Sequence, residues 1–275
     1  MNPLIDTRLS KTPRLILIAV LVIGVYTIDD QFGWSLYGLA RANLEAGWPH
    51  TVALTFLRYG LWTVLVPLLV AAIVVGPHRS AKALGLDGSP WVAAKMGLIA
   101  TAILPIAYAL TAPISSESIA NAVIRGAILP GIGEEILYRG MLFGLLFRYG
   151  RWGFAPAALL GAILFGAGHL YQGNTPGELL GVFGITAIGA IWFSWLYIEW
   201  DNNIWMPASF HLLMNMYWAI FDVADNALGG IGLVAIRGVV ILISIALTAR
   251  HARRRGYFVI TRRNLFWHRD APSPL

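Results

Sequence analysis

Eight long apolar runs, separated by short polar segments, are the feature that most restricts the fold of this chain. They cover residues 15–28, 51–75, 91–112, 119–147, 154–171, 178–197, 204–221 and 229–249. Hydrophobic residues make up 57% of the 275 residues and charged residues 12%, about half the charged fraction of an ordinary soluble domain. The sequence therefore predicts an all-α, polytopic integral membrane protein with about eight transmembrane helices, in a single membrane domain over residues 1–275.

The first run has a competing interpretation, because basic residues precede it, as they precede the apolar part of a signal peptide. No small-residue cleavage site is found before Asp29 and Asp30, so we favour a retained first helix. Residues 31–50 contain aromatic and charged side chains and are predicted to form an interfacial or loop segment. No internal repeat and no second domain is found in the sequence.

The basic residues are distributed unevenly between the two sides that eight spans would define. The side of both termini holds Arg79, Lys82, Arg148, Arg151 and a basic tail, residues 250–275, whereas the opposite loops hold mainly Arg41, Glu117, Glu178, Asp222 and Asp225. This bias agrees with the positive-inside rule and predicts cytoplasmic termini. It also accounts for the formal net charge of +6 without a nucleic-acid partner, since the tail can lie against anionic lipid headgroups.

The fourth run contains ionisable residues, which are costly inside a bilayer and need a reason to be there. Glu135 and Arg139 are four residues apart, so on a helix they share a face and can form an ion pair. Glu134 is rotated by about 100° from Glu135 and points elsewhere. We therefore interpret Glu135 and Arg139 as mainly structural, and Glu134 as the residue that most needs a functional explanation.

Two further runs carry polar side chains. His169 lies near the end of the fifth run, and His211 and Asn215 lie four residues apart, on one face of the seventh. Each cluster has a structural explanation, since His169 could be an interface residue and the His–Asn pair could hydrogen-bond two helices together. Taken with Glu134, however, they indicate a polar, water-accessible centre among the spans, and most such centres are functional.

Two mechanisms of amide hydrolysis fit these side chains. In the first, Glu134 and His169 activate a water, and His211 and Asn215 donate hydrogen bonds to the oxyanion. In the second, His169, His211 and a glutamate bind Zn²⁺, and the remaining glutamate activates the metal-bound water. The chain has no Cys and no HExxH motif, so thiolate chemistry is excluded and the common helical zinc-protease motif is missing.

The polar residues resemble the motifs of a known family. Glu134-Glu135-x-x-x-Arg139, Phe165-x-x-x-His169 and His211-x-x-x-Asn215 are similar in order, spacing and placement on separate spans to the three motifs of the CPBP family. This family of intramembrane proteases includes the CAAX prenyl endopeptidases and bacterial bacteriocin-processing and immunity proteins. The matched catalytic core covers residues 119–221, and Tyr138 stands where phenylalanine is common before the motif arginine.

The resemblance implies an α-helical intramembrane endopeptidase that cleaves near the C-terminus of a membrane-associated peptide or protein, in a bacterial cytoplasmic membrane. It assigns water activation to Glu134 and His169, and oxyanion stabilisation to His211 and Asn215. We favour a mechanism that needs no cofactor, because only two histidines could bind zinc. A non-proteolytic immunity or adaptor protein of the same fold is the alternative, and a proton-coupled transporter is disfavoured because inverted repeats are not visible.

Overall fold

The computed structural model describes residues 11–28, 32–43, 48–116, 119 and 122–267. Within these residues the regular elements are all helices, joined by two isolated β-bridges, Ile114 with Phe221 and Trp152 with Trp267. The all-α fold class expected from the apolar runs is confirmed. Glu117 and residues 268–275 of the basic tail, which entered the charge argument, lie outside the described residues.

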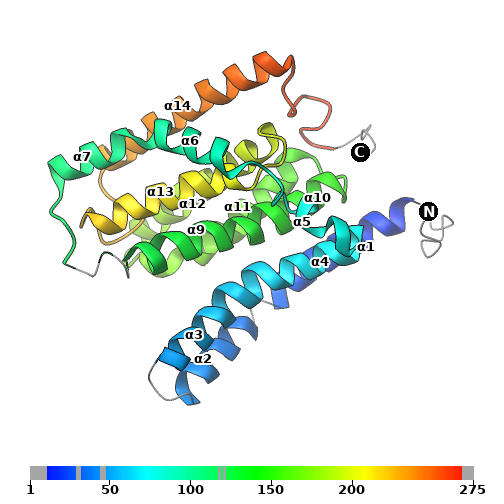
Figure 1. Cartoon of the computed structure of the whole chain (residues 1–275), viewed down its shortest axis with the longest axis horizontal. Coiled ribbons are helices and arrows are strands. Elements are labelled where there is room, and N and C mark those ends of the chain that lie inside the picture. Colours follow the sequence, from blue (N-terminus) through cyan, green and yellow to red (C-terminus); the bar gives the residue numbers. More distant parts are fainter. Residues whose placement is uncertain (1–10, 29–31, 44–47, 117–118, 120–121, 268–275) are drawn as a thin grey trace.

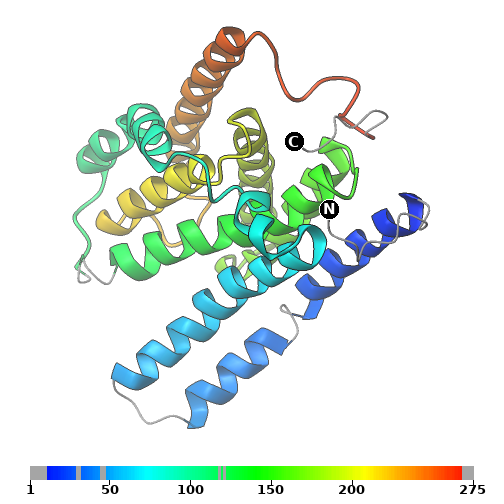
Figure 2. The same ribbon diagram turned by 45° about the vertical axis from the view of Figure 1, so that its right-hand side comes forward.

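The N-terminal helices form a layer along one side of the molecule, seen in blue and cyan in Figures 1 and 2. Helix α1 (Lys11–Ile28) is followed by α2 (Trp34–Asn43), and one continuous helical segment then comprises α3 (Trp48–Thr55), the π-helical η2 (Phe56–Leu65) and α4 (Val66–Val75). The segment expected to be interfacial or a loop, residues 31–50, therefore contains a ten-residue helix. Its mixed polarity hid that helix in the sequence.

A second continuous helical segment crosses the centre of the molecule (Figure 1). It comprises the π-helical η4 (Ala122–Ile128), α9 (Leu129–Glu134), the π-helical η5 (Glu135–Phe143) and α10 (Gly144–Arg148). Glycines let its neighbours approach: a Cβ on Gly131 would lie 2.9 Å from the backbone nitrogen of Leu212, and a Cβ on Gly133 would collide with the side chain of Thr63. The central segment is thus held between η2 and α13 (Trp205–Ile220).

The remaining helices enclose the other side of this central segment. Helices α11 (Phe154–Gly168) and α12 (Pro176–Glu199) pack against each other, with the short η6 (Leu170–Gln172) between them. Helix α6 (Pro90–Thr101) packs against α13. The chain bends by 42° between α6 and α7 (Ile103–Thr111), close to Pro105, which has no backbone N–H to donate within the helix. Helix α14 (Ile231–Arg255) covers α6 and α7, and the short η3 (Pro77–Arg79) and α5 (Ser80–Ala83) follow α4.

Each of the eight apolar runs corresponds to helix in the described residues. Segments Val52–Val75, Phe154–Gln172, Pro176–Glu199 and Ile231–Arg255 are long and apolar enough to cross a membrane, and the bent pair α6–α7 makes a fifth candidate. Outward-facing leucines such as Leu69, Leu110 and Leu180 are well exposed, as lipid-facing side chains would be. The chain is an integral membrane protein built from helices.

Several basic segments meet at one end of the molecule. Arg148 donates to the carbonyl of Ala83 at 2.7 Å, and Arg255 forms ion pairs with Glu199 and Asp201. The backbone N–H groups of residues 154 and 155 donate to the carbonyls of residues 264 and 265, which brings the C-terminal segment to the same end. Figure 1 shows the start of α1 on this side as well.

Candidate active site

The two adjacent glutamates have different surroundings. Glu134 is the last residue of α9 and Glu135 the first of η5, where the hydrogen-bonding pattern changes from α to π; π-helical turns are often found at functional sites. The side chain of Glu135 is completely buried, while that of Glu134 keeps 21% of its surface exposed. The pair therefore presents one carboxylate to the protein interior and one to a cavity.

Glu135 is the centre of a buried polar cluster. Its Oε1 accepts from Arg139 Nη1 at 2.9 Å and lies 2.7 Å from His211 Nδ1. The Arg139 guanidinium is itself buried and lies over two aromatic rings, 4.7 Å from the Phe165 centroid and 5.2 Å from that of Phe193. The expected Glu135–Arg139 pair is present, and its contact with His211 is a finding that local spacing could not supply.

This cluster orients His211. The Nδ1–H of His211 donates to the Glu135 carboxylate, so the opposite ring nitrogen, Nε2, faces the cavity. Nε2 lies 3.9 Å from Oε2 of Glu134. That separation is too long for a direct hydrogen bond, but a water could contact both atoms. A carboxylate on Nδ1 that fixes the tautomer and direction of an imidazole is a recurrent device in hydrolytic sites.

His169 is oriented by the backbone of its own helix. It follows the last residue of α11, and its Nδ1 lies 2.7 Å from the carbonyl oxygen of Phe165. Because a carbonyl only accepts hydrogen bonds, Nδ1 carries the proton and Nε2 of the neutral ring has a lone pair. Phe165 thus contacts both Arg139 and His169, since its ring centroid lies 4.4 Å from that of His169.

Asn215 is one turn further along α13 than His211. Its Nδ2 donates to the carbonyl of Gly126 at 3.2 Å, which connects α13 with η4. An amide nitrogen has two hydrogens, so this contact leaves one for another acceptor.

One cavity of about 480 Å³ brings the motif residues together. The motif side chains on its wall are those of Glu134, Arg139, His169, His211 and Asn215. Glu135 lies behind this wall, where it contacts Arg139 and His211. Residues that are 81 positions apart in the chain thus line one space, as the polar spacing had predicted.

Three arginines that the sequence reasoning did not consider also line this cavity: Arg58, Arg125 and Arg237. Each lies within an apolar run, and an ionisable residue at that position is a signal of a functional or water-accessible site. Arg237 donates to the carbonyls of Ala227 and Leu228 and lies 5.1 Å from the Trp218 ring centroid. It therefore holds the segment after α13 at the rim of the cavity.

Across the described ranges, no three His, Asp or Glu side chains are grouped so that they could hold a metal ion. His211 uses Nδ1 for Glu135, and the Nδ1 of His169 faces a backbone carbonyl, so Nε2 is the ring atom of each histidine that remains for a ligand. The choice between the metal-free and the zinc mechanism stays a prediction.

Comparison with known proteins gives two matches. Residues 116–217 match the family described as type II CAAX prenyl endopeptidase Rce1-like. Over 106 residues the chain is 30% identical to a Bacillus subtilis (strain 168) protein named "Putative membrane peptidase YdiL". The aligned residues make up 38% of this chain and 39% of that protein. The match thus spans about two fifths of the length of that relative. No solved structure matches the chain.

Proposed function

We propose that this chain, whose residues 116–217 match the type II CAAX prenyl endopeptidase Rce1-like family, belongs to the CPBP family and is an intramembrane endopeptidase that hydrolyses a peptide bond of a membrane-associated peptide or protein. The observation that carries the proposal is the convergence of Glu134, His169, His211 and Asn215, from three separate apolar helical segments, on one cavity. Polar residues at such a depth are expensive unless they serve a function. The family match and the relative named as a membrane peptidase support the same reaction class.

In the proposed mechanism Glu134 is the general base. Shielded from bulk water, its carboxylate accepts a proton from a water that also donates to Nε2 of His169. The water oxygen then bonds to the scissile carbonyl carbon and forms a tetrahedral oxyanion. Collapse of this intermediate breaks the C–N bond, and the proton held by Glu134 passes to the leaving amine.

His211 and Asn215 stabilise the oxyanion. When both ring nitrogens of His211 carry protons, Nε2–H donates into the cavity while Nδ1–H donates to Glu135. The second hydrogen of Asn215 Nδ2, which the Gly126 carbonyl does not use, is the other donor. Donors that are held in place before the reaction contribute most to such stabilisation. Glu135 and Arg139 are positioning residues, because they fix His211 without facing the reacting atoms.

The substrate enters from the lipid or its interface, and the protein lies in a bacterial cytoplasmic membrane with both termini on the cytoplasmic side. The basic contacts of residues 148, 255 and their neighbours at one end of the molecule support this orientation. No step requires a cofactor, and no nucleic acid takes part. The CAAX-like specificity of the family is part of the proposal and awaits a substrate.

The proposal is tested by profiling new peptide termini in membranes of cells that express the wild type or Glu134→Gln. We expect a set of membrane-protein termini in the wild type that Glu134→Gln lacks. Glu178→Gln is the matched control, because Glu178 is a half-buried residue in the first turn of α12 that accepts from the backbone N–H of Asn174 and does not line the cavity; it should retain the wild-type set. Identical termini with and without Glu134 would favour a non-proteolytic adaptor of the same fold.

A further inference from the structure

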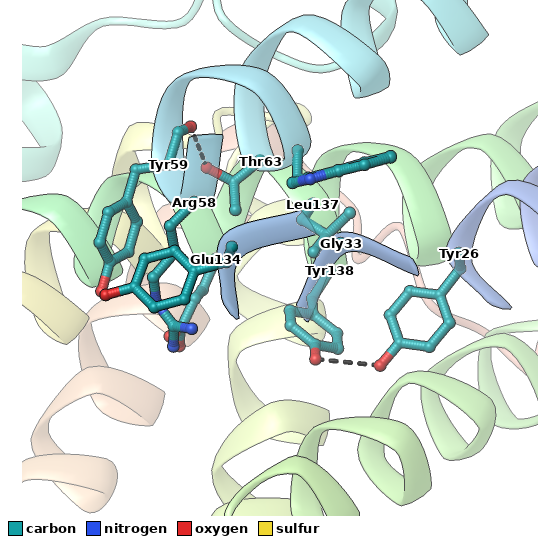
Figure 3. Close-up of a pocket in the computed structure, with 10 residues that line it drawn as sticks. Tyr26, Gly33, Arg58, Tyr59, Thr63, Glu134, Leu137 and Tyr138 are labelled. Atoms are coloured by element: carbon teal, nitrogen blue, oxygen red, sulfur yellow. Dashed lines mark hydrogen bonds between the residues drawn. The ribbon is translucent and has the colours of Figure 1, made fainter. Parts of the chain in front are cut away.

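Glu134 also lines a second cavity. This space of about 110 Å³ lies between the N-terminal helices and the central segment around Glu134 and η5 (Figure 3). Its lining residues are Tyr26, Gly33, Tyr37, Arg58, Tyr59, Trp62, Thr63, Glu134, Leu137 and Tyr138. We call it the small chamber. Its wall shares Arg58, Tyr59 and Glu134 with the large cavity that holds the motif histidines.

The wall of the small chamber is unusually polar for the inside of a helical membrane protein. The hydroxyls of Tyr26 and Tyr138 lie 3.1 Å apart, and Thr63 donates to the carbonyl of Tyr59 (Figure 3). Arg58 and the partly exposed Glu134 add a guanidinium and a carboxylate to this wall. Polar groups of this kind in native proteins are mostly hydrogen-bonded, either to the protein or to ordered water.

The size of the chamber also suits water. A volume of about 110 Å³ is several times what one buried water needs, so the chamber has room for more than one. Waters bounded by phenols, a guanidinium and a carboxylate would have the two to four polar partners that each buried water needs. An apolar ligand would leave these groups without partners.

Hydrolysis inside a membrane consumes one water for each bond cleaved, while the substrate itself fills the large cavity. We propose that the small chamber is a bound-water site that supplies water to Glu134 from the side opposite the substrate. The supply role rests on the proposed function; the binding of water does not. Tyr59 is then a positioning residue for this water, since it forms part of both walls.

The absence of Cys from the chain allows a direct test of water access. Thr63→Cys places one thiol of similar size on the chamber wall, and Ala71→Cys places one in the fully buried core of α4, two turns further on. Both variants, reconstituted in lipid nanodiscs without substrate, are reacted with a charged methanethiosulfonate, whose sulfur is attacked by ionised, water-exposed thiols with release of methanesulfinate. We expect Thr63→Cys to react at least about tenfold faster than Ala71→Cys. Equal rates would overturn the water site.

The supply role is tested on the same labelled protein. Modification at residue 63 fills the chamber, so kcat for a cleaved peptide should fall about tenfold or more while KM changes little, because substrate binding in the large cavity is untouched. Labelling of Ala81→Cys, which is exposed in the short helix α5 beyond the end of this helical segment, is the control and should leave kcat unchanged. A labelled Thr63→Cys protein with full kcat would overturn the supply role even if the thiol rates show a water-filled chamber.

Discussion

Replacement of Glu135 by alanine should destabilise the fold, although its neighbour Glu134 can be replaced without such a loss. Glu135→Ala removes the carboxylate that pairs with Arg139 at 2.9 Å and with His211 at 2.7 Å. The arginine side chain, with 1% exposure, then has no counter-charge. Breaking a buried ion pair in this way costs about 3–5 kcal/mol.

The structure places this variant near the lower end of that range. The guanidinium keeps its contacts with the Phe165 and Phe193 rings, and cation–π contacts of a desolvated group retain up to about 2 kcal/mol. We therefore expect a loss of about 3 kcal/mol in the free energy of unfolding. Glu134→Gln should lose less than about 1 kcal/mol, because the Glu134 side chain is partly exposed and its ion-pair partner among the described residues, His211, is 3.9 Å away.

A double-mutant cycle separates the ion pair from simple loss of packing. The double variant Glu135→Leu/Arg139→Met removes both charges together. Its loss in the free energy of unfolding should be smaller, by about 2 kcal/mol or more, than the sum of the losses of the two single variants. Unfolding would be followed by tryptophan fluorescence in mixed detergent micelles. A loss below about 1 kcal/mol for Glu135→Ala, or strict additivity in the cycle, would refute the assignment of Glu135 as a structural anchor.

Three further predictions follow from single contacts. Asn215→Ala removes an oxyanion donor, so kcat should fall about 10²–10³-fold with little change in KM; an unchanged kcat would remove Asn215 from the site. Gly133→Ala should cost about 1–3 kcal/mol in thermal unfolding because its Cβ would collide with η2, while Gly161→Ala, with open space at its Cβ, should not; equal stability would refute the close packing. Glu199→Ala removes the acceptor for two backbone N–H groups of the C-terminal segment, so trypsin should cleave after Arg262 faster than in the wild type, and an equal rate would contradict the anchoring.

The sequence was sufficient for the helices of the apolar runs and for naming the motif residues that surround the large cavity. Apolar runs that are long enough to span a membrane predict transmembrane helices. The four-residue spacing of Glu135 and Arg139 predicts that the two side chains lie on the same face of a helix. The family resemblance expected from the three motifs is confirmed by the Rce1-like match. The roles of the site residues stay predictions until a substrate is cleaved.

Long-range contacts were beyond the sequence. The hydrogen bond between His211 and Glu135 joins residues 76 positions apart, and no local period encodes which face of α13 meets η5. The helix at residues 34–43 was missed because its mixed polarity resembles a loop. Arg58 and Arg237 were left out of the site although an arginine within an apolar run was itself a signal.

The small chamber illustrates the same limit. It is formed by side chains from α1, η2 and η5, whose relative placement depends on close contacts such as that between Gly133 and Thr63. The sequence shows small residues near the motifs, but it does not show which neighbouring helix packs against each of them. Only the packed structure reveals that Glu134 lies between two spaces.

The measurement that tests the central claim most directly is the cleavage of membrane-embedded fluorogenic peptides by the purified protein, with wild type, Glu134→Gln and Glu178→Gln compared in the same nanodiscs. Each would be assayed with a strong chelator and after addition of zinc. We predict cleavage by the wild type and Glu178→Gln that chelation does not change, and loss of cleavage in Glu134→Gln. Full cleavage by Glu134→Gln, or activity that chelation abolishes and zinc restores, would contradict water activation by Glu134 without a metal.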